Sequence, residues 1–379
     1  GLDIASGRAT VASGTSLDAV IRTALPSGWF VPVTPGTRSV TVGGAIAADV
    51  HGKNHHRDGG FCDFVESFEL LSPGAGRLTV TRDAMPEVFG ATAGGMGLTG
   101  VILEATLRLI PVESAWMNVD TERASDLDDL MARMESGDGG YRYSVAWVDC
   151  LSNGRHLGRG VLTRGDHATA DELGRSERRR GALSFRPRSP IPMPPGVPSS
   201  LLRPVTARAF NEFWFRKAPS VERGRLHPLA SFFHPLDGVK NWNRLYGPRG
   251  FVQYQLAVPF SADGVIRTVL ERLSSAGIPS FLGVLKRFGP GRGMLSFPIA
   301  GWTLALDIPA SVPGLAEMLD GLDELVARAG GRIYLAKDAR LRPELLPRMY
   351  PELGRWREVR DRLDPERTMR SDLARRLVL

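Results

Sequence analysis

Residues 35 to 56 join a run of small side chains to a cluster of titratable rings. Gly43, Gly44 and Ala45 open a predicted helix with almost no side-chain bulk, so a flat or anionic ligand could approach the backbone closely. Free N–H groups at a helix start favour negative charge. Three rings follow, those of His51, His55 and His56. The segment therefore predicts a cradle for a cofactor.

Two plainer interpretations of this segment stay open. A Gly-Gly-Ala helix can be small because it packs tightly against a neighbouring strand, and histidines can occupy an exposed turn. Histidine is also the commonest metal ligand. No carboxylate or cysteine lies at recognisable metal-ligand spacing around the three rings, so we predict no metal site.

Further side chains that could do chemistry lie in the second half of the chain. Gln253 and Gln255 are two apart on a predicted strand, so they face one side while Tyr254 faces the other. Two amides on one face could hold sugar hydroxyls, or form the polar outer face of a sheet. Lys286 could pair with a phosphate. Lys337 alone would suggest a surface ion pair with its neighbour Asp338.

The composition is that of a globular protein with two domains. The chain has 379 residues, of which 42% are hydrophobic, and no apolar stretch approaches the roughly 20 residues that span a bilayer. No secretory leader stands at the start. Cys62 and Cys150 are too few for a disulfide scaffold, and we expect both to be free thiols.

The net charge of +7 raises the possibility of a nucleic-acid partner. We expect none, because the arginines are spread along the chain and base-stacking and zinc-knuckle signatures are absent. One local cluster, Arg175 to Arg180, could instead meet anionic lipid headgroups or a lipid phosphate.

The predicted elements form two groups. A strand, a capped helix reaching Ala24, a hairpin over residues 64–81 and a strand over 101–110 indicate a mixed α+β unit. Strands over 141–148, 251–258 and 302–307, with helices over 262–276 and 312–329, indicate an antiparallel sheet backed by helices. Residues 343–377 are predicted to be mostly helical. The Pro-rich stretch 181–204 is predicted to be a passive linker or a flexible lid.

Several segments together resemble one known family. They run in order along the chain: 35–56, 91–100, 250–255, 295–298, 334–338 and 371–377. Their sequences are similar to those of the vanillyl-alcohol-oxidase-type FAD enzymes. The resemblance implies an α+β, two-domain FAD-linked oxidase of the PCMH type with an antiparallel-sheet substrate domain. Its bounds would be 1–113 for the FAD domain, 114–331 for the substrate domain and 332–379 for a segment returning to the FAD domain.

The resemblance also implies site residues and a non-covalent FAD. Lys337 and His51 would be catalytic, with Lys337 accepting the hydroxyl proton or stabilising the reduced ring. For His51 alone, a helix C-terminal cap is the plainer alternative. The positions that match cofactor contacts are Gly36, Thr37, Thr41, Gly43, Gly44, Ala48, Asp49, His51, Ile102 and Tyr334. The substrate side would be formed by Gln253, Gln255, Lys286, Trp214, Lys53 and Thr303, where Trp214 could equally be ordinary core.

The activity implied is FAD-dependent oxidation of the 2-hydroxyl of decaprenylphosphoryl-β-D-ribose to a 2-keto product. This is the first half of an epimerisation to the arabinose used in cell-wall arabinan synthesis, which an NADH-dependent reductase would complete. We would place such a protein at the cytoplasmic or periplasmic face of the membrane, as a peripheral protein. The alternatives are an alditol or aldonolactone oxidase, or an inactive lipid-phosphate-binding paralogue.

The sequence departs from the family pattern in two ways. An Arg-Ser-Tyr-Gly-Asp-like loop that precedes this pattern in the family is missing before Gly1, so we expect the FAD domain to be truncated at its N-terminus. Ala305 stands where the family has a thiol that nitroaromatic suicide inhibitors attack. Thr303, Met96 and Phe233 also differ, so sugar specificity is less firmly implied than flavin use.

Overall fold

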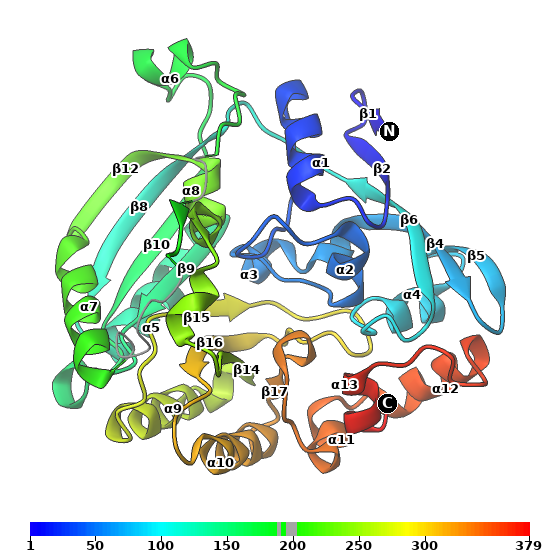
Figure 1. The fold of residues 1–379 in the computed structure, drawn as a ribbon. Helices are drawn as coiled ribbons and strands as arrows, with labels where there is room; N and C mark the ends of the chain where they lie inside the picture. The colour runs from blue at the N-terminus through cyan, green and yellow to red at the C-terminus, as the bar shows by residue number, and fades with distance from the viewer. Residues whose placement is uncertain (188–190, 195–202) are drawn as a thin grey trace.

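The computed structural model describes residues 1–187, 191–194 and 203–379. The possible lid over 181–204 therefore lies partly outside the described residues. Two antiparallel sheets dominate, and Figure 1 shows the blue and cyan N-terminal sheet beside a larger green and yellow one. This agrees with the predicted α+β class, in which helices back an antiparallel sheet.

The smaller sheet has five strands in the order β1-β2-β6-β4-β5. Its strands are β1 (Leu2–Asp3), β2 (Arg8–Ala12), β4 (Val65–Ser72), β5 (Gly76–Thr81) and β6 (Val101–Arg108). Its helices are α1 (Leu17–Ala24), α2 (Val42–Ala47), α3 (His55–Asp58) and α4 (Pro86–Thr92), and a short pair joins β3 (Trp29–Phe30) to β7 (Ile110–Pro111). The predicted capped helix is confirmed, since Ser16 Oγ accepts from the Ala19 N–H.

The larger sheet has eight strands in the order β12-β8-β10-β9-β15-β16-β14-β17. They are β8 (Trp116–Ala124), β9 (Tyr143–Val148), β10 (Gly160–His167), β12 (Val221–Pro228), β14 (Phe251–Pro259), β15 (Gly283–Phe288), β16 (Gly301–Pro309) and β17 (Arg332–Ile333). The helices in this part are α5 (Leu127–Gly137), α6 (Arg175–Arg179), α7 (Pro204–Lys217), α8 (Leu229–Phe233), α9 (Gly264–Ser275) and α10 (Leu315–Arg328). A two-residue parallel pair joins β11 (Ile191–Pro192) to β13 (Val239–Lys240).

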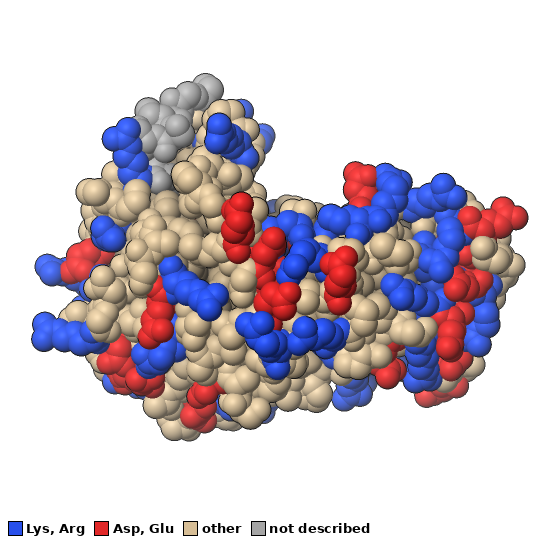
Figure 2. Space-filling view, turned by 90° about the horizontal axis from the view of Figure 1, so that it is seen from below, with Lys and Arg blue, Asp and Glu red and all other residues tan. Residues whose placement is uncertain are grey.

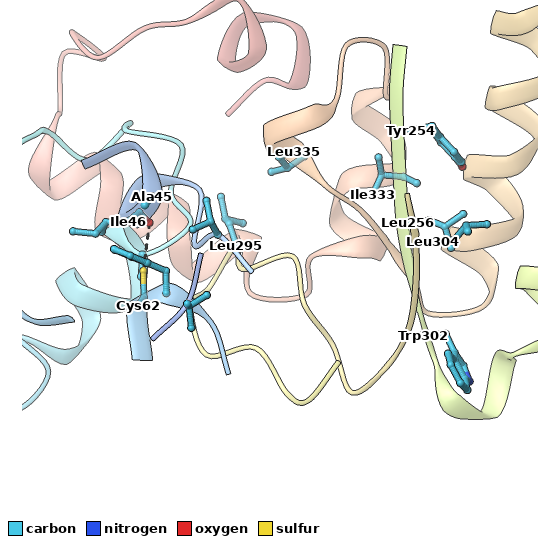
Figure 3. Close-up of a cluster of buried hydrophobic side chains, with 14 of the residues drawn as sticks. Ala45, Ile46, Cys62, Tyr254, Leu256, Leu295, Trp302, Leu304, Ile333 and Leu335 are labelled. Carbon is cyan, nitrogen blue, oxygen red and sulfur yellow. Dashed lines mark hydrogen bonds between the residues drawn. The ribbon is translucent and has the colours of Figure 1, made fainter. Parts of the chain in front are cut away.

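Alternation along β14 and β16 gives the larger sheet two different faces. Tyr254, Leu256, Leu304 and Trp302 lie on the side that α9 and α10 cover (Figure 3). Tyr254 Oη donates to Asp323 Oδ1 on α10 at 3.0 Å. The intervening residues of both strands therefore point to the opposite side, toward the N-terminal part of the chain.

The C-terminal tail packs against the smaller sheet. It contains α11 (Leu346–Met349), α12 (Leu353–Leu363) and α13 (Asp372–Leu377). The Trp356 indole donates to Ala91 O in α4 at 2.9 Å, and Gly74 N donates to Leu363 O at 2.7 Å. Figure 1 shows these red helices beside α4. The domain bounds given above stay predictions.

Both cysteines are free, as predicted, and the structure shows that both are buried. Cys62 lies in a cluster with Ala45, Ile46 and Leu295, and its Sγ contacts Ile46 O (Figure 3). On the face of the molecule seen in Figure 2, basic and acidic side chains are interspersed rather than gathered into one basic tract. No helix among the described residues is long and apolar enough to cross a membrane.

Candidate active site

Three adjacent strands of the larger sheet bring polar side chains to one face. Their register pairs Gln253 with Asp307, Gln255 with Ala305, and Lys286 with Thr303. Paired residues of antiparallel strands share a face. The prediction that Gln253 and Gln255 point together, away from Tyr254, is confirmed. The face is not a solvated outer surface, because Gln255, Thr303, Lys286 and Asp307 are all buried.

His51 reaches this face from the loop between α2 and α3. Its Nε2 lies 2.9 Å from the Gln255 Nε2, and its Nδ1 lies 3.1 Å from the Lys286 Nζ. These contacts join a residue near the start of the chain to two strands more than 200 residues later. The alternative of a helix cap is wrong: α2 ends at Ala47, and the His51 ring bonds to the sheet instead.

The hydrogen-bond contacts indicate one protonation state for this group. Thr303 Oγ1 donates to Leu256 O at 2.8 Å, so it must accept from the Gln255 amide, whose nitrogen lies 3.1 Å away. That orientation also points the amide N–H at His51 Nε2, which therefore accepts. The His51 proton is then on Nδ1 and is donated to Lys286 Nζ, which requires a neutral amine.

The surroundings of Lys286 favour the same neutral amine. Burial, with the nearby charges of Lys337 and Lys53, lowers the pKa of Lys286 to about 7. Burial and the neighbouring Lys286 charge hold the pKa of His51 well below its usual range, so His51 is also neutral. The proton positions inferred from the hydrogen bonds therefore agree with the lowered pKa values of Lys286 and His51.

Two more lysines belong to this buried group. Burial lowers the pKa of Lys53 to about 7, and its Nζ donates to Phe232 O and lies 4.3 Å from the centre of the Phe232 ring. Burial also lowers the pKa of Lys337, while Asp307 opposes the shift. Among the described residues, none of the three lysines forms an ion pair. Lysine amines that are largely shielded from water and have no ion-pair partner suit an anionic ligand, which supplies the missing counter-charge.

Lys337 does not pair with its neighbour Asp338, so that alternative is wrong. Asp338 is bound instead by Arg376 at 2.6 Å. Lys337 ends the 3-10 turn Leu335–Lys337, directly after Tyr334. The Tyr334 ring stacks on Phe297 and lies 5.5 Å from the His51 ring, and its hydroxyl donates to Ala48 O at 3.0 Å. This turn therefore connects Lys337 to the end of α2.

The start of α2 differs from the prediction of free N–H groups. Val42 N donates to Thr15 O at 2.9 Å and Gly43 N to Ser13 O at 2.8 Å, and Gly44 N is capped by Thr41 Oγ1. A Cβ on Gly43 would lie 2.9 Å from Ser13 Cβ. The prediction of an open anion site here is wrong, and Gly43 is small because a neighbouring strand end packs against it. A Cβ on Gly36, in contrast, would meet nothing within 4 Å.

Other predicted cofactor positions surround α2. Asp49 is buried with φ of 39°, and its carboxylate accepts from Cys62 N and from Ser296 Oγ. Burial raises the pKa of Asp49. Ile102 is buried on β6, the strand that α2 contacts. The assignment of these residues, and of Gly36, Thr37 and Thr41, to FAD stays a prediction.

The structure does not gather every predicted residue. Trp214 is 42% exposed on α7 and stacks on Phe210, rather than joining the His51 group. The three histidines of the cradle diverge: His55 Nδ1 accepts from Gly289 N at 3.2 Å, whereas His56 Nε2 lies 3.2 Å from Tyr141 O. Among the described residues, no group of three or more His, Cys, Asp or Glu could hold a metal ion.

Sequence reasoning missed two parts of this site. Asp307 lies opposite Gln253, whose amide donates to it at 2.9 Å, and burial raises the pKa of the Asp307 carboxyl. Phe288 and Phe297 enclose the His51 ring, with ring centres 4.8 and 5.9 Å away. Alternation along β15 and β16 could have indicated Phe288 and Asp307, but it does not reveal strand register. Phe297 lies in the segment 295–298 that supports the family resemblance, but between the two strands, where no local pattern shows that it meets His51.

The residues present fit a flavin. The buried Gln255 Oε1 has no hydrogen-bond partner within the described parts of the chain, which leaves one acceptor on this face. The unpaired lysines around it could stabilise the negative charge that a flavin gains on reduction. The rings of His51 and Tyr334 form one wall of this site, and Lys337 adds an amine beside them. The fold and this site define an FAD-dependent oxidoreductase of the PCMH type.

Comparison with known proteins gives the same class of oxidoreductase and narrows the class to one family. The family described as FAD binding domain matches residues 1–82, and the family described as D-arabinono-1,4-lactone oxidase matches residues 307–377. The chain is 42% identical over 373 residues to decaprenylphosphoryl-beta-D-ribose oxidase of Mycolicibacterium smegmatis, covering 97% of this chain and 80% of that protein. The chain belongs to the family of that oxidase, and its cofactor is FAD.

Two further relatives differ in how much of this chain they match. An uncharacterized protein in the mprA 5' region of Streptomyces coelicolor is 46% identical over 363 residues, which cover 94% of this chain and 97% of that protein. Probable L-gulonolactone oxidase 6 of Arabidopsis thaliana is 30% identical over only 127 residues, or 32% of this chain and 21% of that protein. The similarity to the Mycolicibacterium smegmatis oxidase covers 97% of this chain and so extends through both sheets.

Proposed function

We propose that this chain oxidises the 2-hydroxyl of a polyprenylphosphoryl ribose, decaprenylphosphoryl-β-D-ribose, to a ketone. The observation that carries the proposal is the convergence of His51, Gln255, Lys286 and Lys337 on one buried face. The family relationship supports the choice of substrate, because the relative that covers 97% of the chain is named for it.

When bound, FAD would accept the hydride from the carbinol carbon. Lys337 takes the hydroxyl proton in this proposal. Its buried amine makes no hydrogen bond with a described residue, so its lone pair is available once it is neutral, and burial favours that state. The unpartnered Gln255 Oε1 accepts a hydrogen bond from a sugar hydroxyl and orients the ring.

Lys286 and Lys53 hold the phosphate that links the sugar to its lipid. Both amines have a pKa of about 7 in the free protein, so each can take up a proton when an anion arrives. Above pH 7 most of the positive charge then appears in the complex, and the free site seldom carries two unpaired cations at once.

Two further parts of the proposal concern partners. The 2-keto product requires a reductase, using NADH, to complete inversion at that carbon. The polyprenyl chain requires that the protein work at a membrane surface, as a peripheral protein on the cytoplasmic or periplasmic side.

An anaerobic absorbance scan tests the function. Flavin bands that bleach on addition of a polyprenylphosphoryl ribose support it, and Lys337→Met should keep the bands but bleach far more slowly. Bleaching by a soluble aldonolactone and not by the lipid-linked sugar would favour the lactone oxidase alternative, to which the match over residues 307–377 gives some weight. Absence of flavin would overturn the oxidase assignment.

A further inference from the structure

Helix α7 carries a row of exposed aromatic side chains. Phe210, Phe213 and Trp214 are 41%, 61% and 42% exposed. Among the described residues, only Phe260 is a further large aromatic side chain of comparable exposure. The three positions, with Lys217, follow the spacing i, i+3, i+4 and i+7, so they lie on one face of the helix.

An adjoining side of α7 fixes the helix to the larger sheet. Asn211 is fully buried, and its amide donates to Asp149 Oδ1 at 2.7 Å. Arg159 binds both Asp149 and Glu212, at 2.9 and 2.6 Å. The helix is therefore held in place, and the aromatic row keeps a large exposed area although Phe210 contacts Phe281 on one side.

The charge around the row is positive. Arg203 and Lys217 are exposed, and the Lys217 Nζ lies 5.8 Å from the Phe213 ring and 5.9 Å from the Trp214 ring. The single acidic residue of the helix, Glu212, is already neutralised by Arg159 and Arg216. Aromatic rings beside unpaired cations are typical of helices that lie in the headgroup region of an anionic bilayer.

The row is also connected to the active-site sheet. Phe210 packs edge-on against Phe281, with ring centres 5.2 Å apart. The Trp147 indole donates to Phe281 O, and Trp147 pairs across the strands with Val284, two residues from Lys286. Apolar contacts thus run from the helix toward the buried lysines.

We infer that the exposed face of α7 docks on an anionic lipid bilayer and so presents the active site to a lipid-borne substrate. The inference rests on the proposed function only for the reason why the protein would bind a bilayer. The vesicle-binding test does not depend on the proposed function. The arginine cluster of α6 lies at the other end of the larger sheet (Figure 1), so it is not part of this surface.

Vesicle co-sedimentation tests the inference without flavin or turnover. The protein should bind vesicles of phosphatidylcholine with about one third phosphatidylglycerol, and much less to phosphatidylcholine alone. The double variant Phe213→Ala, Trp214→Ala should lower the partition coefficient by about tenfold or more, because two interfacial rings are lost. Phe260→Ala and Arg179→Ala, away from α7, should leave it unchanged.

A second measurement follows the indole itself. Trp214 fluorescence, taken as the difference between the native protein and Trp214→Phe, should shift to the blue with anionic vesicles and be quenched by brominated lipid. Equal binding by the double variant, or no quenching, would overturn the inference while leaving the oxidase proposal intact. A concentration-dependent dimer that Phe213→Ala dissociates would overturn it in favour of a second copy of this chain. Vesicle binding without oxidation would instead contradict the proposed function.

Discussion

His51 Nδ1 lies 3.1 Å from the Lys286 Nζ, and no carboxylate of the described residues lies beside either group. Two basic groups this close cannot both be charged in a buried site without a large electrostatic cost. The chain from Leu256 O through Thr303 and Gln255 leaves one arrangement, with the proton on His51 Nδ1 and a neutral Lys286. The free site is thus prepared to take up a proton.

Thr303→Val should remove the hydrogen bond that fixes the orientation of the Gln255 amide. Without the hydroxyl that accepts from it, the Gln255 amide can turn and offer its oxygen to His51, which moves the ring proton to Nε2. We expect turnover to fall by about tenfold, roughly one strong hydrogen bond, and its pH profile to shift. Nitrogen-15 spectra of labelled histidine report the tautomer directly, with His51→Gln to assign the signal.

Thr303→Ser is the matched control for that variant. It keeps the hydroxyl and should restore both the tautomer and the pH profile. The same His51 tautomer in Thr303→Val and the native protein would contradict the role of Thr303.

Anion binding should take up protons. The pKa of Lys286 is about 7 in the free protein, and an anion beside it raises this value, so binding between pH 7 and 9 adds a proton to the complex. Affinity for a short-chain polyprenyl phosphate should therefore fall as the pH rises above 7, by up to tenfold per unit for each proton. Titration calorimetry in two buffers of different ionisation enthalpy measures the uptake.

Lys286→Met should remove about one proton from that uptake. Lys53, whose pKa is also about 7, can supply a second, so Lys53→Met distinguishes the two contributions. An uptake that is unaffected by either substitution would show that neither amine meets the anion.

Nitroaromatic suicide inhibitors should not form an adduct with the native chain. Ala305 lies on the active-site face opposite Gln255 and Val284, and the sequence resemblance predicts that it takes the place of the thiol that these inhibitors attack. Ala305→Cys should restore stoichiometric labelling, because it places a thiol at a half-buried point of that face. Intact-mass spectrometry after turnover checks both, and an adduct on the native chain would refute the expectation.

Gly43 and Gly36 should respond differently to alanine. At Gly43 the added Cβ meets Ser13 Cβ at 2.9 Å, so Gly43→Ala should destabilise the flavin-free protein by about 1–3 kcal/mol. Gly36 has open space, so Gly36→Ala should leave the melting temperature unchanged. If Gly36 contacts the cofactor, its variant should lower FAD affinity severalfold. Equal melting temperatures would contradict the packing role of Gly43.

The sequence by itself determined the local elements and the identity of the chemical groups. Period-two alternation predicted that Gln253 and Gln255 share a face, and capping predicted the helix at Ser16. These features depend on neighbours within a few residues, so they can be derived from the sequence alone. The family resemblance depended on the identity and order of several motifs in the same way.

Only the tertiary structure decided which of those groups meet. Strand register placed Asp307 opposite Gln253 and Ala305 opposite Gln255, and register is set by pairing between segments about 50 residues apart. The tertiary fold places the loop that carries His51 against the strand that carries Lys286. In the same fold, the first N–H groups of α2 donate to the carbonyls of Ser13 and Thr15 and are not free for a ligand. Proton positions and lowered pKa values follow from burial and from these long-range contacts, which no local pattern encodes.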